Sequence, residues 1–381
     1  MQDAQFAIIL HYEFCIMNLK EYQGKEIFEQ CGIRTPGGVL IRKGEAVPAE
    51  VYKMGPKVSI KAQVAKGKRK KAGGIVFVDN KPEIVEREVA RIFAMTISGL
   101  KVEEILIYGF LDVSAEMYLS ITIDRVAKCP MVVFCEEGSV DVETVAAENP
   151  DKVKKIKIKN SKEIQNIKYQ TGISDEVIDV IQKLYRLFVE KDGTLVEINP
   201  LVRLKSGELM ALDAKVVIDD NALFRHSELA KYKTDDYTEL EKEAKTEGMS
   251  YVELDGDIAV IGNGAGLVMA TLDTLAHFGG RVANFLDVGG GATAEQMKKA
   301  LSIALKKPGV KKIFINIFGG ITRADEIAQG LVDFVKENGL NIPVVLRVVG
   351  TREKEAKAIL LKAGIKFEDE MEKAAQEIIE T

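Results

Sequence analysis

Two stretches define the expected fold of the first part of the chain, Leu195-Val196-Glu197-Ile198-Asn199-Pro200-Leu201 and Ala211-Leu212-Asp213-Ala214-Lys215-Val216. Apolar and polar residues alternate with period two in both, as they do in a half-buried β-strand. The Ser206-Gly207 pair between them marks a turn, so an antiparallel hairpin is expected. Alternation then places Glu197 and Asn199 on one face, and the hairpin brings Asp213 alongside Asn199.

This polar face allows two interpretations. The Asn199 amide oxygen and the Asp213 carboxylate are hard oxygen ligands, which suit a Mg²⁺ ion that bridges nucleotide phosphates. Polar side chains on the exposed face of a two-stranded ribbon are also ordinary and need bind nothing. The spacing does not separate the two interpretations, so the rest of the sequence has to decide.

Length and composition are those of an ordinary globular protein with more than one domain. Of the 381 residues, 46% are hydrophobic and 29% are charged. The net charge of −5 argues against general nucleic-acid binding, and no apolar run approaches the roughly 20 residues that span a membrane. The cysteines form no CxxC pair, so we expect reduced thiols in a cytoplasmic protein at Cys15, Cys31, Cys129 and Cys135.

The regular part of the chain is expected to begin at Met17. Residues 1–16 have no basic residue before their apolar run, unlike a secretory signal, and are interpreted as an N-terminal extension. An amphipathic helix is expected over residues 18–31, with Asn18 as N-cap and Glu21 three places on as its capping-box partner.

A basic loop is the next candidate for ligand binding. The alternating strand 58–64 places Lys61 on one face, and it leads into the glycine-bearing basic loop 66–74. Glycines permit close approach to phosphates and cations neutralise their charge, although a solvated basic turn would read the same way. Nucleic-acid binding is disfavoured because no aromatic residues are interleaved for stacking.

The composition changes over residues 227–248, which predicts a domain break near 245–250. Beyond it, nearly continuous apolar strands alternate with helices near 266–278, 294–306, 323–338 and 353–363, which indicates a doubly wound parallel sheet in an α/β protein. Three strands end in glycine, a pattern expected either for tight turns or for a rim that binds phosphate or carboxylate. A dinucleotide-binding fingerprint with its ribose-binding acid is absent, which disfavours an oxidoreductase.

Motifs along the whole chain from Met17 to the C-terminus resemble, in matching order, the β subunit of succinate–CoA ligase (succinyl-CoA synthetase), a member of the ATP-grasp family. The N-terminal motifs are Met17–Lys25, Lys61–Val64 and Lys71–Gly74, followed by Glu197–Leu201, Leu212–Lys215 and Asn221–Arg225. The most specific are Asn263–Leu267, Ala283–Ala292 and Asn316–Ile321.

The resemblance implies an ATP-grasp domain over 17–245, with a lid subdomain at about 37–100, and a flavodoxin-like CoA-ligase domain over 250–381. It implies a reversible acid–thiol ligase of the tricarboxylic acid cycle, in which cleavage of a nucleoside triphosphate (ATP, or alternatively GTP) drives formation of succinyl-CoA from succinate and coenzyme A. A histidine on an α subunit carries the phosphoryl group, in an αβ or α₂β₂ assembly. In agreement with that division of labour, no histidine of this chain lies in a glycine-rich rim.

The family's functional residues carry over onto matching positions. The resemblance makes Asn199 and Asp213 the Mg²⁺ ligands and Glu197 the carboxylate that orients the visiting phosphohistidine. The implied nucleotide-contacting residues are Lys61, Arg69 and Glu116, and Lys68 and Lys70 of the same basic loop are also predicted to bind the nucleotide. The implied substrate-proximal residues, beside the α subunit, are Asn263, Gly320, Ile321 and Thr322, and the helix that follows would direct its positive end at the phosphohistidine.

Two positions depart from the family pattern. The loop reads Lys68-Arg69-Lys70 where the family has Gly-Arg-Gly, and Tyr108 stands where a glutamate is expected. Both departures affect positions expected to contact the nucleotide, and neither affects the Mg²⁺ or subunit-contact motifs. They leave two alternatives open: a related ligase, for malate or another dicarboxylate, and a weakened paralogue that binds the α subunit but handles nucleotide poorly.

Overall fold

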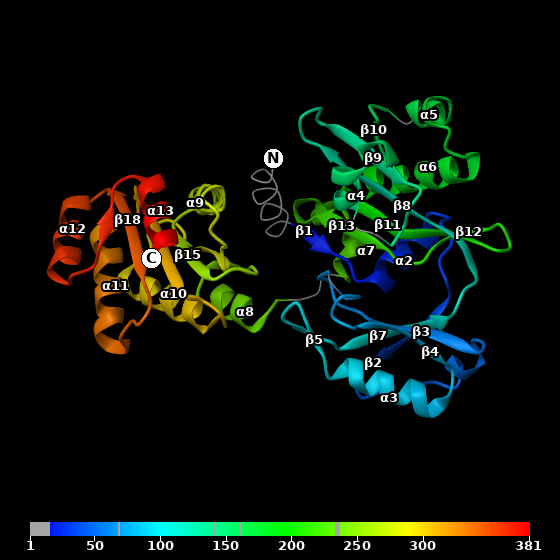
Figure 1. The fold of residues 1–381 in the computed structure, drawn as a ribbon, viewed down its shortest axis with the longest axis horizontal. Helices are drawn as coiled ribbons and strands as arrows, with labels where there is room; N and C mark the ends of the chain where they lie inside the picture. Colours follow the sequence, from blue (N-terminus) through cyan, green and yellow to red (C-terminus); the bar gives the residue numbers. More distant parts are fainter. Residues whose placement is uncertain (1–15, 68, 140–141, 161, 233–236) are drawn as a thin grey trace. The chain divides into compact units, whose positions relative to one another are not determined.

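The computed structural model describes residues 16–67, 69–139, 142–160, 162–232 and 237–381 (Figure 1). The chain forms two compact units that divide between residues 236 and 237. Residues 1–15 of the expected extension lie outside the described residues, and Ile16 is the first residue of strand β1 (Ile16–Asn18). Within the described part of the chain, no helix is both long and apolar enough to cross a membrane.

The larger sheet of the N-terminal unit is antiparallel throughout and has the order β1-β13-β11-β8-β9-β10, with β12 paired to β11. Its apolar face packs against helix α6 (Asp175–Glu190), which contributes Ile181, Leu184 and Leu187 to the core. The strands are β8 (Val113–Asp124), β9 (Cys129–Cys135), β10 (Val153–Lys157), β11 (Gly193–Leu204), β12 (Leu209–Ala211) and β13 (Lys215–Asp219).

The predicted hairpin is confirmed, with one refinement. Strand β11 pairs with β12 through Leu201 and Ala211, and the Leu204 amide donates to the Glu208 carbonyl across the turn. Residues 212–214 then leave the sheet before β13 begins at Lys215, which pairs with Glu197. Asp213 therefore lies on a short connection between two strands, where its side chain is not committed to either sheet face.

A second sheet, β2-β7-β3-β4, carries helix α3 (Pro82–Phe93) along one face (Figure 1). Val58 and Ile60 of β3 point into the core beneath α3, so alternation places Ser59 and Lys61 on the opposite face. The strands are β2 (Gly38–Arg42), β3 (Lys57–Ala62), β4 (Ile75–Asp79) and β7 (Glu104–Gly109), and a small ribbon joins β5 (Thr96–Ile97) to β6 (Leu100–Lys101).

Helix α2 (Glu21–Gln30) begins later than predicted. Asn18 belongs to β1, and the residue before the helix is Lys20, whose amide donates to the Gln23 side chain at 2.9 Å. The expected Asn18–Glu21 capping box is wrong because Asn18 continues the sheet, pairing with Val217. The unit is completed by α4 (Val142–Glu148), α5 (Glu163–Thr171), α7 (Ser227–Ala230) and the 3₁₀ turns η1 (Val51–Lys53), η2 (Pro150–Lys152) and η3 (Asp220–Arg225).

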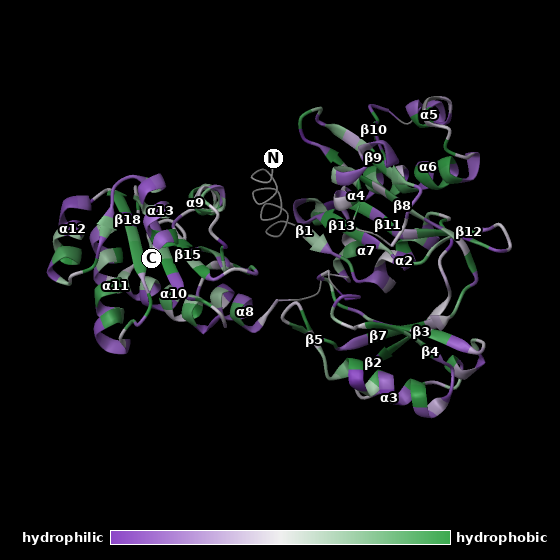
Figure 2. Ribbon diagram, in the orientation of Figure 1, coloured by the Kyte–Doolittle hydropathy of each residue, from purple (hydrophilic) through white to green (hydrophobic). Residues whose placement is uncertain are grey.

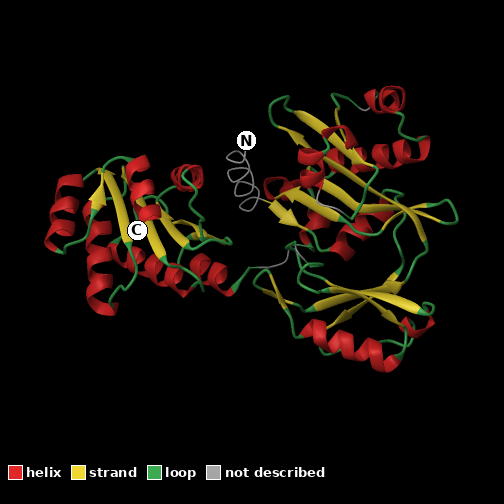
Figure 3. Ribbon diagram, in the orientation of Figure 1, coloured by secondary structure: helices red, strands yellow, loops and turns green. Residues whose placement is uncertain are grey.

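The C-terminal unit is the expected doubly wound α/β fold, with helices on both faces of its sheet (Figure 3). The sheet order is β14-β16-β15-β17-β18-β19, and every pair is parallel except β14 with β16. The strands are β14 (Ser250–Glu253), β15 (Ile258–Gly262), β16 (Asn284–Asp287), β17 (Lys312–Gly319), β18 (Val344–Gly350) and β19 (Phe367–Glu368).

Two separate apolar cores flank this sheet, which is why its central strands carry apolar residues on both faces (Figure 2). The predicted helices appear as α9 (Ala265–His277), α10 (Ala294–Lys306), α11 (Ala324–Asn338) and α12 (Glu353–Lys362), and α13 (Met371–Glu380) joins α9 on one face. Helix α8 (Glu239–Thr246) packs here through Ala244, so this unit begins before the break predicted near 245–250.

A side chain completes the sheet where β15 and β16 pair poorly. The strands are in register only at Gly262 and Asp287, with an isolated bridge at Ile258. In between, the buried Asn284 amide accepts from the Val260 N–H at 3.2 Å and donates to the Val260 carbonyl at 2.8 Å. These bonds satisfy backbone groups that would otherwise be buried without partners.

Candidate functional site

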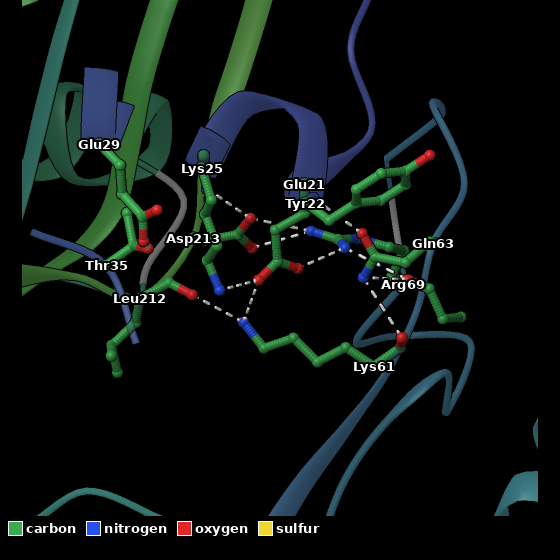
Figure 4. Close-up of polar contacts among 12 residues, drawn as sticks. Glu21, Tyr22, Lys25, Glu29, Thr35, Lys61, Gln63, Arg69, Leu212 and Asp213 are labelled. Carbon is green, nitrogen blue, oxygen red and sulfur yellow. Dashed lines mark hydrogen bonds and ion pairs between the residues drawn. The ribbon is translucent and has the colours of Figure 1, made fainter. Parts of the chain in front are cut away.

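The centre of the N-terminal unit's candidate site is Glu21, at the first position of α2, whose side chain has no exposed surface (Figure 4). Three cations surround it. Lys25 Nζ and Lys61 Nζ lie 2.7 and 2.9 Å from its Oε1, and Arg69 Nη1 lies 2.6 Å from its Oε2. Burying a charge is costly unless it is paired, and this carboxylate has three partners.

Arg69 also reaches the connection between β12 and β13. Its Nη2 lies 3.0 and 2.9 Å from the two carboxylate oxygens of Asp213, so one guanidinium joins Glu21 to Asp213. Lys61 reaches the same connection by donating to the Leu212 carbonyl at 2.9 Å. The structure thus brings together three of the residues predicted from sequence, Lys61, Arg69 and Asp213.

The ionisation of this cluster follows from burial and charge. Although burial alone would raise it, the pKa of Glu21 lies well below its usual value because Lys25, Lys61 and Arg69 stabilise the carboxylate. The pKa of Lys61 is raised above its usual value, since Glu21 and Asp213 outweigh its desolvation. Burial lowers the pKa of Lys25. The two carboxylates do not balance the three cations, so the cluster is suited to receive a further anion.

Tyr108 forms one wall of the same cluster. It lies on β7 opposite Ser59 of β3, and the ammonium groups of Lys25 and Lys61 lie 4.5 and 5.1 Å from its ring centroid. The aromatic face therefore stabilises two cations at the position where a glutamate is expected from the sequence. Burial raises the pKa of the phenol, which keeps this wall neutral.

Two glycines of the basic loop, Gly73 and Gly74, occupy positions that a larger residue would not fit. Gly73 has φ +77°, and a Cβ added at Gly74 would lie 2.6 Å from Ile97 Cδ1. Lys70 is exposed, and Lys68 lies outside the described residues. The close approach to the site is made by the Arg69 side chain.

Glu197 lies on β11 beside β8 and β13. Tyr118 donates a hydrogen bond to its Oε2 at 3.0 Å, and burial raises the pKa of Glu197 against the attraction of Lys215. Two positions further along the strand, the Asn199 Oδ1 accepts from the Ser139 N–H at 2.8 Å, and a cis peptide bond joins Asn199 to Pro200. The Glu116 side chain is exposed on neighbouring β8, outside the buried cluster.

The donors for a metal ion are of the right chemistry. Asp213 offers a carboxylate and Asn199 an amide oxygen, the hard ligands that Mg²⁺ takes together with phosphates and water. Both Asp213 oxygens accept hydrogen bonds from the Arg69 guanidinium, so a metal ion would have to replace that contact on at least one of them. No group of three or more His, Cys, Asp or Glu side chains in the described ranges is arranged to hold a metal alone, so phosphate oxygens and water would have to complete the ligand set.

The glycine rim of the C-terminal unit is built differently. The Asn263 amide donates to the Phe318 carbonyl at 2.9 Å and to Thr322 Oγ1 at 3.1 Å, and it accepts from the Phe318 N–H at 2.9 Å. Thr322 is buried and also accepts from the Gly291 N–H at 3.0 Å. Gly320 and Ile321, between these anchored residues, are exposed.

Sequence reasoning missed Glu21 and Lys25 as site residues. Both lie in the Met17–Lys25 motif, where Glu21 was predicted only as a capping-box residue. Their spacing of four on an amphipathic helix was a signal for an ion pair, but nothing local indicated Lys61 or Arg69 as partners. Tyr118 was missed as well.

None of the described histidines lies in the glycine rim. His226 is buried with Nε2 2.6 Å from Asp192 Oδ2, and His277 stacks edge-on against Phe278. His11 lies outside the described residues.

Two family models match the chain: an ATP-grasp domain over residues 18–203 and a CoA-ligase over residues 261–379. The fold and the two family matches together define the class of protein, which has an ATP-grasp domain followed by a CoA-ligase domain. The fold is similar over 96% of this chain and 100% of the other to ATP citrate lyase from Methanothrix soehngenii in complex with citrate and coenzyme A, with a TM-score of 0.59 at 16% identity.

Relatives narrow the class. The chain is 43% identical over 372 residues, 95% of its length and 98% of the relative's, to the succinate–CoA ligase [ADP-forming] subunit beta of Ignicoccus hospitalis. It is 44% identical to the succinate–CoA ligase [GDP-forming] subunit beta of Thermus thermophilus, over 90% of this chain and 93% of the relative. The chain belongs to the succinate–CoA ligase β-subunit family.

Proposed function

We propose that this chain is the β subunit of a succinate–CoA ligase, which couples cleavage of a nucleoside triphosphate to formation of succinyl-CoA from succinate and coenzyme A. The observation that carries the proposal is identity above 40% with β subunits of that name over nearly the whole chain. The buried surplus of positive charge around Lys61 and Arg69 supports it, because a polyphosphate needs such a site.

The active enzyme is proposed to include an α subunit, as an αβ or α₂β₂ assembly. The α subunit would supply the histidine that is phosphorylated, for which the described part of this chain offers no candidate in its glycine rim. Asn263 and Thr322 would then hold the exposed turn at Gly320 and Ile321 in position for that partner and the substrate. Helix α11 begins just beyond, and its N-terminal end would favour a phosphoryl group there.

Nucleotide binding is assigned to the N-terminal unit. Lys61 and Arg69 would bind the phosphates, Lys68 and Lys70 would add positive charge at the loop, and Glu116 would contact the nucleoside from the exposed face of β8. Fixed cations in a site that excludes water stabilise charge that develops during phosphoryl transfer. ATP is the proposed nucleotide, giving ADP.

Asn199 and Asp213 would hold Mg²⁺, which when bound neutralises the phosphate charge and orients the transferred group. Glu197 would orient the phosphohistidine, accepting a hydrogen bond from its ring while Tyr118 holds the carboxylate in place. Glu197 is partly buried, which strengthens such an interaction because less water competes for it.

The test is co-expression with the α subunit encoded by the same genome, followed by thioester formation from succinate and coenzyme A with Mg-ATP or Mg-GTP. Product that requires both subunits and one nucleotide would support the proposal. Product with malate but not succinate would identify a related acid–thiol ligase. A stable complex without product from any dicarboxylate would favour the weakened paralogue and contradict the proposal.

A further inference from the structure

Glu21 has more charged partners than a helix start requires. An acidic residue in the first turn of a helix is favourable when it faces solvent, and one lysine four residues on completes an ordinary pair. Here the carboxylate is fully buried and its two oxygens are divided between different partners: Oε1 receives Lys25 and Lys61, and Oε2 receives Arg69. Helix formation alone does not account for this arrangement.

The surrounding contacts hold Glu21 in place independently of any ligand. The neighbouring Tyr22 N–H donates to the Gln63 side chain at 3.0 Å, which fixes the start of α2 against the end of β3. Lys20 Nζ lies 3.2 Å from Glu104 Oε2 on β7 (Figure 4 shows the Glu21 side of this junction). The carboxylate is therefore a fixed point between α2 and the second sheet.

Arg69 is attached at two ends that differ in burial. Its Nη1 rests on the wholly buried Glu21, whereas its Nη2 rests on Asp213, whose side chain is 23% exposed and lies on a short connection outside the sheet. An arriving phosphate can compete for the Nη2 end while the Nη1 end stays bound, so the guanidinium can exchange Asp213 for a phosphate without leaving the site.

We propose that Glu21 is the positioning residue of the polyphosphate site: it anchors Lys61 Nζ and Arg69 Nη1, while Arg69 Nη2 moves from Asp213 to a phosphate oxygen of the incoming nucleotide. The inference rests on the proposed function, because it assumes a nucleoside di- or triphosphate as ligand. Asp213 is released by the same exchange to face the metal ion that accompanies the nucleotide.

The direction in which Glu21→Gln changes the affinity for Mg-ADP distinguishes a positioning role of Glu21 from a role in charge balance alone. If Glu21 only offsets the cations, Glu21→Gln raises the positive charge of the site and Mg-ADP binds as well or more tightly. If Glu21 positions Lys61 and Arg69, Glu21→Gln weakens Mg-ADP binding by at least about tenfold, since the loss of one fixed charged contact is worth that much. Glu21→Asp, which keeps the charge, should recover part of the loss.

The experiment is calorimetric titration of the αβ complex with Mg-ADP, together with KM and kcat for the nucleotide, for wild type, Glu21→Gln, Glu21→Asp and the double variant Glu21→Gln/Lys25→Met. The double variant restores the net charge of the cluster and protects against misfolding of the single one. Glu29→Gln, on the exposed side of the same helix, is the matched control.

We expect an increase in KM for the nucleotide of about tenfold in Glu21→Gln and in the double variant, with Glu29→Gln unchanged. Wild-type affinity in the double variant would overturn the inference, as would equal or tighter binding in Glu21→Gln. If wild type itself binds no Mg-ADP, the proposed function fails; if wild type binds and Glu21→Gln binds equally, only the role of Glu21 fails.

Discussion

The two candidate binding regions of this molecule are held together by different kinds of polar contact. In the N-terminal unit, Glu21, Lys61, Arg69 and Asp213 form a buried network of full charges. In the C-terminal unit, the turn at Gly320 is held by neutral groups, chiefly the Asn263 amide and the Thr322 hydroxyl. Both regions are candidates for binding anionic groups, but the first is built around cations, whereas the charged group of the rim is the Asp287 carboxylate, which accepts from the Gly264 and Gly289 N–H groups.

The charged network and the glycine rim depend on the rest of the chain to different degrees. The charged network needs a helix, a strand, a loop and an inter-strand connection to meet, and removal of any member takes a charged partner away from a buried side chain. The rim uses the ends of neighbouring parallel strands, which meet at one edge of any such sheet. The network should therefore respond sharply to single substitutions and the rim more gradually.

The largest expected effect is that of Asp213→Ala, which removes both a proposed metal ligand and the outer partner of Arg69. We expect metal-dependent turnover to fall by at least 10²–10³-fold, on the order of the loss of one preorganised charged group, with assembly of the subunits intact. Steady-state rates with varied Mg²⁺ and size-exclusion chromatography test this. Glu208→Ala, an exposed carboxylate on the adjacent turn, is the control; unchanged turnover in Asp213→Ala would remove its assigned role.

Glu197→Gln is expected to slow phosphorylation of the partner histidine by nucleotide by on the order of a hundredfold, while phosphorylation from succinyl-CoA and phosphate persists. Burial raises the pKa of Glu197, so acidification should remove its ionised form at a higher pH than for an ordinary glutamate. The wild-type rate from nucleotide should therefore fall early on the acid side, and this fall should disappear in the variant. Equal losses from both phosphoryl donors would contradict the assignment.

Asn263→Ala tests the neutral rim. Loss of its hydrogen bonds to Phe318 and Thr322 should lower the free energy of unfolding of the C-terminal unit by about 2 kcal/mol and impair thioester formation, leaving Mg-nucleotide affinity unchanged. Urea denaturation and calorimetry measure the two quantities. Asn263→Asp, which keeps the acceptor but not the donor, should be intermediate. A loss of nucleotide affinity in Asn263→Ala would contradict the prediction that the rim and the nucleotide site act separately.

Tyr108→Phe should have the smallest effect. Phenylalanine keeps the ring that the Lys25 and Lys61 ammonium groups contact, so removing the hydroxyl should change KM for ATP or GTP by less than about threefold. Kinetics with both nucleotides measure it. A change of preference between ATP and GTP would show instead that the phenol contacts the nucleoside.

The sequence predicted the features that depend on local patterns, and it did not predict those that depend on tertiary contacts. Alternation sufficed to predict β11 and a hairpin after it, because a strand's pattern is local, but the predicted second strand over residues 211–216 is divided between β12 and β13. Glycine after each apolar strand was enough to predict the rim, because parallel strands end at a common edge. The doubly wound C-terminal fold followed for the same reason.

The role of Glu21 could not be read from its surroundings in sequence. Its partners Lys61 and Arg69 lie 40 and 48 residues further along, and the Asp213 that shares Arg69 lies 144 residues beyond that loop. A side chain whose role depends only on partners distant in sequence cannot be recognised from the residues around it. Helix α8 misled for a related reason: its polar composition resembles a linker, and only Ala244 and its few apolar neighbours tie it to the second core.

The basic loop has a consequence for protein engineering. Its backbone restrictions rest on Gly73 and Gly74, and its contact with the cluster is made by the Arg69 guanidinium, while the Lys70 side chain is exposed. A saturation library over residues 69–74 should therefore accept most residues at 70, very few at 73 and 74, and essentially arginine alone at 69. The surface charge at position 70 could then be changed to adjust nucleotide affinity without redesigning the site.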